Sequence, residues 1–165
     1  QVLTSDGWFK TGDIGKWVHK RFLKITDRRK DIFKTSSGRF VAPQPIEILL
    51  NSSQFIESSM IYGFNRPFVV ALILPDFEGL EQWCFANRVH WTAPEYMILN
   101  PKVLKLYNAL IEQVNTELQN HEKIKKFLLI SDKWTPELGQ LTPTMKIRRN
   151  VIEDTYQAEL DSLYD

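Results

Sequence analysis

Four short runs along the chain carry the hydrophobic pattern of β-strands. They form two pairs, residues 14–18 with 22–26 and residues 58–64 with 68–74. In the first pair apolar and polar side chains alternate around His19-Lys20-Arg21, and a period of two is typical of a strand. In the second pair β-branched and aromatic residues flank Asn65-Arg66-Pro67, which is a turn-forming sequence. The pattern therefore predicts two hairpins, and a third strand is expected at residues 125–130.

Helical periodicity is clearest in the second half of the chain. Five apolar residues are spaced by three or four positions and fall on one face of a predicted helix that begins near Pro101 and runs for about five turns: Leu104, Tyr107, Ile111, Val114 and Leu118. The spacing also fits a coiled-coil seam, but a helix facing the core is favoured. Further helices are predicted at residues 43–50, 78–87 and 150–163. Strands interleaved with helices predict an α+β fold, in which a small sheet of about three strands is flanked by helices and preceded by a β-hairpin.

Composition places the chain among ordinary globular proteins. Hydrophobic residues make up 43% and charged residues 25% of its 165 positions, which is enough for one good core. No apolar stretch approaches the roughly 20 residues of a membrane-spanning helix, and no signal peptide is visible. The single cysteine, Cys84, cannot form an internal disulfide, so a reducing, cytoplasmic setting is expected. Because Asp6-Gly7-Trp8-Phe9 already resembles the inside of an element, we expect the chain to be a piece of something larger.

The charges are unevenly distributed, although the net charge is only +1. Residues 1–39 carry ten Lys and Arg against four Asp and Glu, a balance of +6, and the remaining residues carry −5. A basic segment of this kind suits an anionic partner such as a phosphate, a nucleic acid or an acidic membrane surface. A solvated hairpin face would have the same charge, so charge alone leaves both interpretations open.

Three residues carry candidate chemistry, and each has an ordinary structural alternative. Asp13 follows Gly12, and a carboxylate on a tight turn can accept hydrogen bonds from two sugar hydroxyls or can bond its own backbone. Arg28 offers planar donors to sugar or phosphate oxygens, or is simply a surface arginine. Lys146 follows a proline and two threonines, so its ammonium would stand on an extended loop, either near a reacting phosphate or carboxylate or in solvent.

Several other chemistries lack their residue patterns. His19, His90 and His121 are far apart in the sequence and show no Cys/His ligand spacing, so no metal site is expected. The sequence contains no G-x-S-x-G, no Walker A loop and no G-x-G-x-x-G.

Motifs in five places follow one another along nearly the whole chain. They are Asp6-Gly7-Trp8-Phe9-Lys10-Thr11-Gly12-Asp13, Asp27-Arg28-Arg29-Lys30-Asp31-Ile32-Phe33-Lys34, Ser37-Gly38-Arg39-Phe40-Val41-Ala42-Pro43, Ile46-Glu47 and Leu141-Thr142-Pro143-Thr144-Met145-Lys146. In this order they resemble the C-terminal domain of AMP-forming acyl-CoA synthetases, in the adenylate-forming superfamily that includes luciferases. The stretch from Arg66-Pro67-Phe68 to Pro75, and the S-S-G loop after Lys34, are similar to the long-chain fatty acyl-CoA synthetase branch.

The resemblance implies roles for residues in an adenylation step. Asp13 matches the residue that binds the ribose hydroxyls of ATP or of the acyl-adenylate, with Arg28 assisting. Lys146 matches the catalytic lysine that bridges the acyl carboxylate and the α-phosphate. The family often has glycine immediately before this lysine, and Met145 stands there in this sequence.

Other residues are implied in a second, thioester-forming step. Lys30 matches the hinge about which the C-terminal domain rotates between the two half-reactions. Gly38 matches a loop that then enters the active site and lines the pantetheine tunnel of CoA. Lys34 lies near that loop and would contact the adenylate in the same orientation.

The resemblance also implies the organisation of the parent protein. Residues 1–29 would end the large-domain side with a ribose-binding hairpin, and residues 30–165 would form the mobile C-terminal lid. The large N-terminal adenylation domain would hold the fatty-acid tunnel and Mg²⁺, so this chain alone is expected to be inactive. The implied partners are ATP, CoA, a long-chain fatty acid and that N-terminal domain, but no nucleic acid. The location would be cytoplasmic, compatible with peripheral membrane association. A stand-alone nucleotide- or CoA-binding module and a nucleic-acid binder are the alternatives.

Overall fold

The fold is built around a three-stranded sheet of mixed direction. The computed structural model describes residues 3–28 and 31–165, without the side chains of residues 26–28. Strands β5 (Ile56–Tyr62) and β6 (Val69–Pro75) pair antiparallel, and β7 (Ile124–Leu129) pairs parallel with β6 in the order β5-β6-β7. Every residue of the central strand is buried, which explains its uninterrupted apolar sequence. The predicted hairpin and third strand are confirmed.

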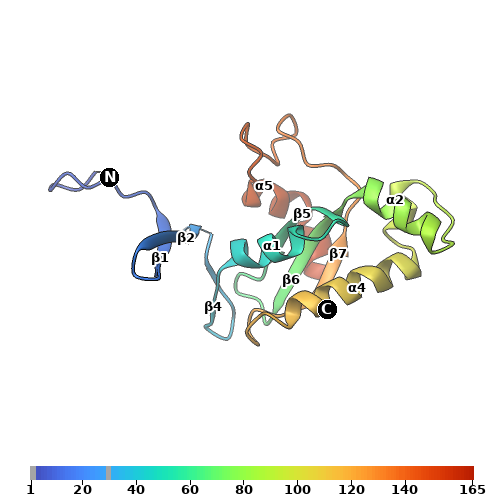
Figure 1. Cartoon of the computed structure of the whole chain (residues 1–165), viewed down its shortest axis with the longest axis horizontal. Coiled ribbons are helices and arrows are strands. Elements are labelled where there is room, and N and C mark those ends of the chain that lie inside the picture. Colours follow the sequence, from blue (N-terminus) through green and yellow to red (C-terminus); the bar gives the residue numbers. More distant parts are fainter. Residues whose placement is uncertain (1–2, 29–30) are drawn as a thin grey trace.

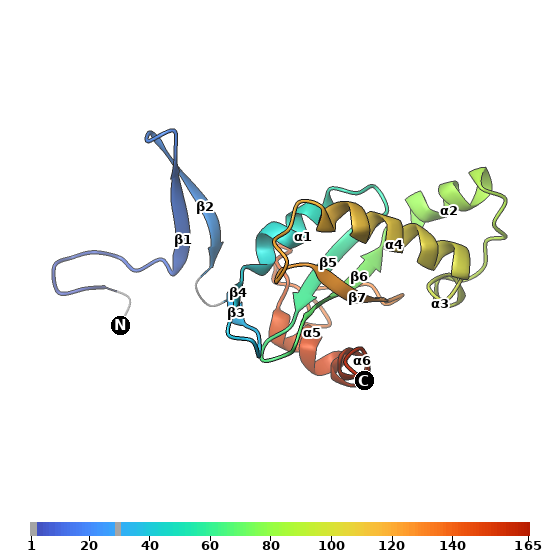
Figure 2. The ribbon, with the colours of Figure 1, turned by 90° about the horizontal axis from the view of Figure 1, so that it is seen from below.

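Helices cover both faces of this sheet. Helices α1 (Pro43–Asn51) and α4 (Pro101–Asn115) lie on one face, and α5 (Arg149–Thr155) and α6 (Gln157–Ser162) lie on the other (Figure 1, Figure 2). Alternation along β6 supplies one core cluster on each side: Ala71 and Ile73 pack with Leu50 and Tyr107, whereas Leu72 packs in the other cluster. Helices α2 (Phe77–Ala86) and α3 (Pro94–Met97) lie at one end. The α+β fold predicted from the sequence is confirmed.

Helix α4 is shorter than its periodicity suggests. It has 15 residues and ends at Asn115, so the prediction that Leu118 belongs to it was wrong. The Asn115 side chain explains the end, because its amide pairs with both backbone groups of Ile124 at the start of β7, at 2.9 and 3.0 Å. Leu118 still packs against the core from the loop that follows.

The predicted C-terminal helix is two helices rather than one. The break falls at Tyr156, whose backbone leaves the helical region with φ −111° and ψ 22°. Tyr156 is itself buried, together with Ile152 before it and Leu160 after it. All three side chains belong to the same core cluster, so the apolar face continues across the break.

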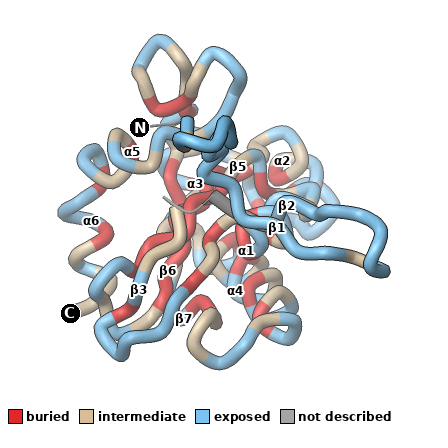
Figure 3. Tube along the Cα trace, turned by 90° about the vertical axis from the view of Figure 1, so that its left-hand side faces the viewer, coloured by how far each residue is buried: buried red, intermediate tan, exposed pale blue. Residues whose placement is uncertain are grey.

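A separate hairpin precedes the globular part of the molecule. Strands β1 (Asp13–Val18) and β2 (Phe22–Arg28) pair only with each other, as predicted, and the described side chains of this hairpin are almost all exposed (Figure 3). The loop His19-Lys20-Arg21 joins the strands: His19 and Lys20 have positive φ angles of 51° and 55°, and the Arg21 amide donates to the Val18 carbonyl at 3.2 Å. A two-stranded hairpin with both faces in water is marginally stable. Its apolar side chains therefore suit a covering partner.

Candidate functional site

Lys146 stands on a tight loop that is closed by backbone hydrogen bonds. Leu141 and Ile147 form an isolated β-bridge at its base, and the Thr142 amide donates to the Lys146 carbonyl at 2.8 Å. The Lys146 amide donates to Thr142 Oγ1 at 3.0 Å. Met145 adopts a φ of 60° to complete the turn. The loop thus holds the Lys146 side chain at the surface, where it is exposed.

Lys146 and Asp13 line the same cleft, although they are 133 positions apart in the sequence. The cleft has a volume of about 700 Å³ and also involves Glu47 and Arg149. Asp13 begins β1, directly after Gly12, which has the positive φ of 78° expected for a tight turn. Cleft walls that carry both a carboxylate and an ammonium suit a ligand with hydroxyls and a phosphate.

Arg28 is the backbone partner of Asp13 across the β1–β2 pair. Its side chain is not among those described, and Lys30, the predicted hinge, lies outside the described residues altogether. The hairpin register nevertheless places the Asp13 and Arg28 backbones side by side.

Lys34 and Gly38 belong to a different small hairpin and do not line that cleft. Strands β3 (Phe33–Lys34) and β4 (Phe40–Val41) are two residues each and enclose the loop that contains Gly38. Gly38 has a φ of 83°, and the Lys34 ammonium lies 5.7 Å from the ring centre of Phe40. The predicted site residues are therefore divided between two surfaces, Asp13 and Lys146 on one and Lys34 and Gly38 on the other.

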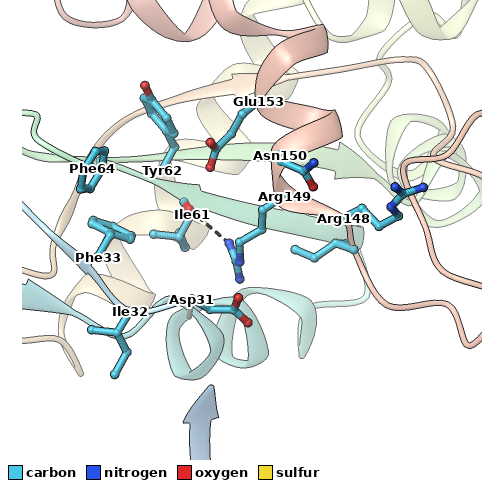
Figure 4. Close-up of a pocket in the computed structure, with 12 residues that line it drawn as sticks. Asp31, Ile32, Phe33, Ile61, Tyr62, Phe64, Arg148, Arg149, Asn150 and Glu153 are labelled. Carbon is cyan, nitrogen blue, oxygen red and sulfur yellow. Dashed lines mark hydrogen bonds between the residues drawn. The ribbon is translucent and has the colours of Figure 1, made fainter. Parts of the chain in front are cut away.

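An ion pair between Glu47 and Arg149 supports the cleft and was not predicted from the sequence. Both guanidinium nitrogens donate to the Glu47 carboxylate, at 2.7 and 2.6 Å, and the Ile61 amide donates to the same carboxylate at 2.8 Å. Arg149 also reaches the Ile61 carbonyl (Figure 4). The pair links α1, β5 and the start of α5, only three residues after Lys146. The available signal was an acidic residue on the apolar face of α1.

A second cleft, of about 520 Å³, is also lined by Arg149. Figure 4 shows Asp31, Phe33 and Glu153 among the side chains around it. Burial raises the pKa of Glu153, the nearby Arg149 opposes that shift, and Asp154 adds to it. The carboxyl of Glu153 therefore resists ionisation more than an exposed glutamate does.

The described residues contain neither a metal-binding cluster nor a membrane-spanning helix. No group of three or more His, Cys, Asp or Glu side chains there could hold a metal ion. Within the same residues, no helix is both long enough and apolar enough to cross a membrane.

A small mixed sheet between two helical layers, with a lysine loop and a carboxylate-bearing hairpin on one cleft, is the arrangement expected of a C-terminal domain of the adenylate-forming class. Residues 30–165 match the model of the AMP-binding enzyme C-terminal domain family, and the chain belongs to that family.

Curated relatives cover essentially the whole chain. It is 33% identical over 162 residues to a long-chain-fatty-acid–CoA ligase of Mycobacterium tuberculosis, covering 98% of this chain and 27% of the relative. It is also 33% identical over 170 residues to long-chain-fatty-acid–CoA ligase 6 of Homo sapiens, covering 99% and 24%. The chain thus spans about a quarter of the length of these relatives.

Solved structures agree with the fold. The adenylation domain of a carboxylate reductase from Mycobacterium chelonae superposes with a TM-score of 0.79 and 26% identity, over 99% of this chain and 24% of that one. The corresponding domain from Segniliparus rugosus, solved with AMP and a carboxylic acid, gives the same TM-score and identity. The resemblance inferred from the sequence motifs is therefore confirmed.

Proposed function

We propose that this chain is the C-terminal part of a long-chain fatty-acid–CoA ligase. The parent would convert a fatty acid and ATP to an acyl-adenylate and diphosphate, and then transfer the acyl group to CoA with release of AMP. The observation that carries the proposal is the cleft shared by Asp13 and Lys146, together with the curated relatives.

Lys146 would act in the first half-reaction. A fatty-acid carboxylate approaching the α-phosphate of ATP brings two negative groups together, and an ammonium between them lowers that electrostatic cost. Asp13 would accept hydrogen bonds from the ribose hydroxyls, and Arg28 would assist. Mg²⁺ would be held by the large N-terminal domain, as the family resemblance implies.

Lys34 and Gly38 would act in the second half-reaction. Their position away from the Lys146 cleft supports use of the domain in two orientations, with Lys30 as the hinge between them. Rotation would withdraw Lys146 after adenylation and present the Gly38 loop to the incoming thiol, since one mobile domain can serve two steps by hinge motion. Residues 1–29 would remain with the large domain, and the family match beginning at residue 30 supports this boundary.

The proposal is tested by measuring the two half-reactions separately in the full-length protein. Lys146→Ala is expected to lower ATP–diphosphate exchange by about a hundredfold or more and to leave thioester formation from supplied acyl-adenylate nearly intact. The exposed Lys133, paired with Glu57 at 3.4 Å, provides the matched control Lys133→Ala, which should change neither rate. Equal loss of both half-reactions in Lys146→Ala would contradict the assignment.

The alternative function is a nucleotide- or CoA-binding module without catalysis. An upstream reading frame that encodes a Ser/Thr/Gly-rich phosphate loop would exclude it. Under the ligase proposal the 165 residues alone form neither acyl-adenylate nor acyl-CoA, and activity of the isolated chain would contradict that expectation.

A further inference from the structure

The loop that carries Gly38 is attached to the turn between β5 and β6. The Ser36 amide donates to the Arg66 carbonyl at 3.0 Å, and the Asn65 amide donates to the Lys34 carbonyl at 2.8 Å. Phe33 lies directly over Gly63 at the start of the same turn, where a Cβ on Gly63 would come within 3.1 Å of its ring. The position of the Lys34–Gly38 segment therefore depends on the position of this turn.

The turn itself has little support of its own. Asn65 and Pro67 are exposed, and Asn65 has a positive φ of 55°. Exposed turns of this kind belong to the less stable parts of a protein unless other contacts hold them. Apart from its bonds to Lys34 and Ser36, and a bond from the Arg66 amide to the Gly63 carbonyl at 3.1 Å, this turn is held by side-chain contacts with the C-terminal end of the chain.

Arg66 makes those contacts with its side chain. Its guanidinium forms an ion pair with Asp161 of α6 and lies over the ring of Tyr164, 4.9 Å from the ring centre. Gln157 donates to the same Asp161 carboxylate at 3.0 Å and so fixes its orientation. A planar guanidinium can lie flat on a ring while its edge pairs with a carboxylate, a geometry that the compact ammonium of a lysine does not reproduce.

Tyr164 closes the arrangement from the other side. Its ring packs on Phe68, with ring centres 4.9 Å apart, and its hydroxyl donates to the Phe68 carbonyl at 3.2 Å. Burial raises the pKa of Tyr164, which favours the protonated hydroxyl that this hydrogen bond needs. The C-terminal segment thus contacts both Arg66 and Phe68.

We propose that Arg66 is a positioning residue, which with Asp161 and Tyr164 couples the C-terminal helix to the Lys34–Gly38 loop and so sets that loop for thioester formation. The Arg66 backbone holds the loop, and the Arg66 side chain is held by the C-terminal segment. This inference rests on the proposed function in one respect only, the half-reaction that the loop serves.

The physical coupling is tested by amide hydrogen exchange in the full-length protein. Arg66→Ala is expected to raise the exchange rate of the Ser36 amide by about tenfold, since a turn without the contacts to Asp161 and Tyr164 opens locally more often. Amides of β6 should be unchanged. Arg66→Lys, which keeps the charge but loses the stacking, should give an intermediate rate, and the control Lys133→Ala should match wild type. A Ser36 exchange rate that is unchanged in Arg66→Ala overturns the proposal.

The functional consequence is tested on the separate half-reactions of the same variants. Thioester formation from supplied acyl-adenylate should fall by about tenfold to a hundredfold in Arg66→Ala, since misplacement by about 1 Å costs that much. Adenylation should stay within about twofold of wild type, and Arg66→Lys should recover part of the loss. Equal loss of both half-reactions would indicate general structural damage and overturn the positioning role. A wild-type protein that makes no acyl-CoA would instead refute the proposed function, while the Ser36 exchange would still decide the coupling.

Discussion

Arg149 and Glu47, which are 102 positions apart in the sequence, form a bidentate ion pair with donor–acceptor distances of 2.6 and 2.7 Å. The Glu47 side chain is only 8% exposed and that of Arg149 16% exposed. Buried ion pairs are costly to desolvate and persist when further hydrogen bonds satisfy them, as the Ile61 amide does here. The pair fixes the start of α5 on α1 and β5, and through it the base of the Lys146 loop.

Removing one partner of this pair is expected to lower the free energy of unfolding much more than replacing both partners by apolar residues. Arg149→Met alone should reduce the free energy of unfolding by about 3–5 kcal/mol, because it leaves the Glu47 charge buried without its partner. The double variant Glu47→Leu, Arg149→Met should recover most of that loss. Urea unfolding of the 165-residue chain measures both, and a double variant no more stable than Arg149→Met would show that the ion pair is not the cause.

Met145 is expected to strain the Lys146 loop. Its φ of 60° costs an L-residue about 1–2 kcal/mol, a cost from which glycine is exempt. Met145→Gly should therefore be more stable than Met145→Ala by about 1 kcal/mol, since alanine keeps the strain and neither variant retains the exposed side chain. Urea unfolding of the two variants compares them directly, and equal stabilities would mean that the turn relaxes around any residue.

The sequence predicted the parts of the fold that local pattern determines. Strand β6 was recognisable because both of its faces are buried, and the β1–β2 hairpin because its residues alternate. The pattern could not show that Asn115 ends α4 or that Tyr156 divides the last helix, since both follow from contacts with distant parts of the chain.

In the candidate site, too, local motifs were predictable from the sequence and long-range contacts were not. The motifs located Asp13 and Lys146, and the fold brings them to one cleft. The supporting contacts are long-range pairs of ordinary surface residue types, Glu47 with Arg149 and Arg66 with Asp161, which are 102 and 95 positions apart. The position of Glu47 on the apolar face of α1 signals a buried partner, but no local pattern identifies the partner in either pair, because the pairing exists only after the sheet and helices have packed.

Glu153 is expected to make stability depend on pH. Burial raises the pKa of its carboxyl in the folded state, so the fold favours the neutral form. Its contribution is fully present below the pKa of an unfolded glutamate, about 4.3, and is lost as pH rises through the folded-state value.

Glu153→Gln should accordingly stabilise the chain at pH 7 and give no gain at pH 4. The gain should be below about 1 kcal/mol, because the half-exposed carboxyl is screened by water. Urea unfolding at the two pH values measures it, with the exposed Glu159→Gln as the matched control. A gain of the same size at both pH values would show that ionisation of Glu153 is not its source.

Lys30 is the proposed hinge. Proline there should impair thioester formation and spare adenylation, which is the reverse of the effect expected for Lys146→Ala. Proline fixes φ near −65° and also restricts the residue before it, so a backbone that must rotate at Lys30 loses that freedom. Lys30→Pro should retain ATP–diphosphate exchange within a few-fold and lose most thioester formation from supplied acyl-adenylate. Lys30→Ala removes the same ammonium but leaves φ free, and should support both half-reactions. If Lys30→Pro formed the thioester as fast as Lys30→Ala, rotation would not occur at this residue, and the two-orientation use of Lys146 and Gly38 would need another pivot.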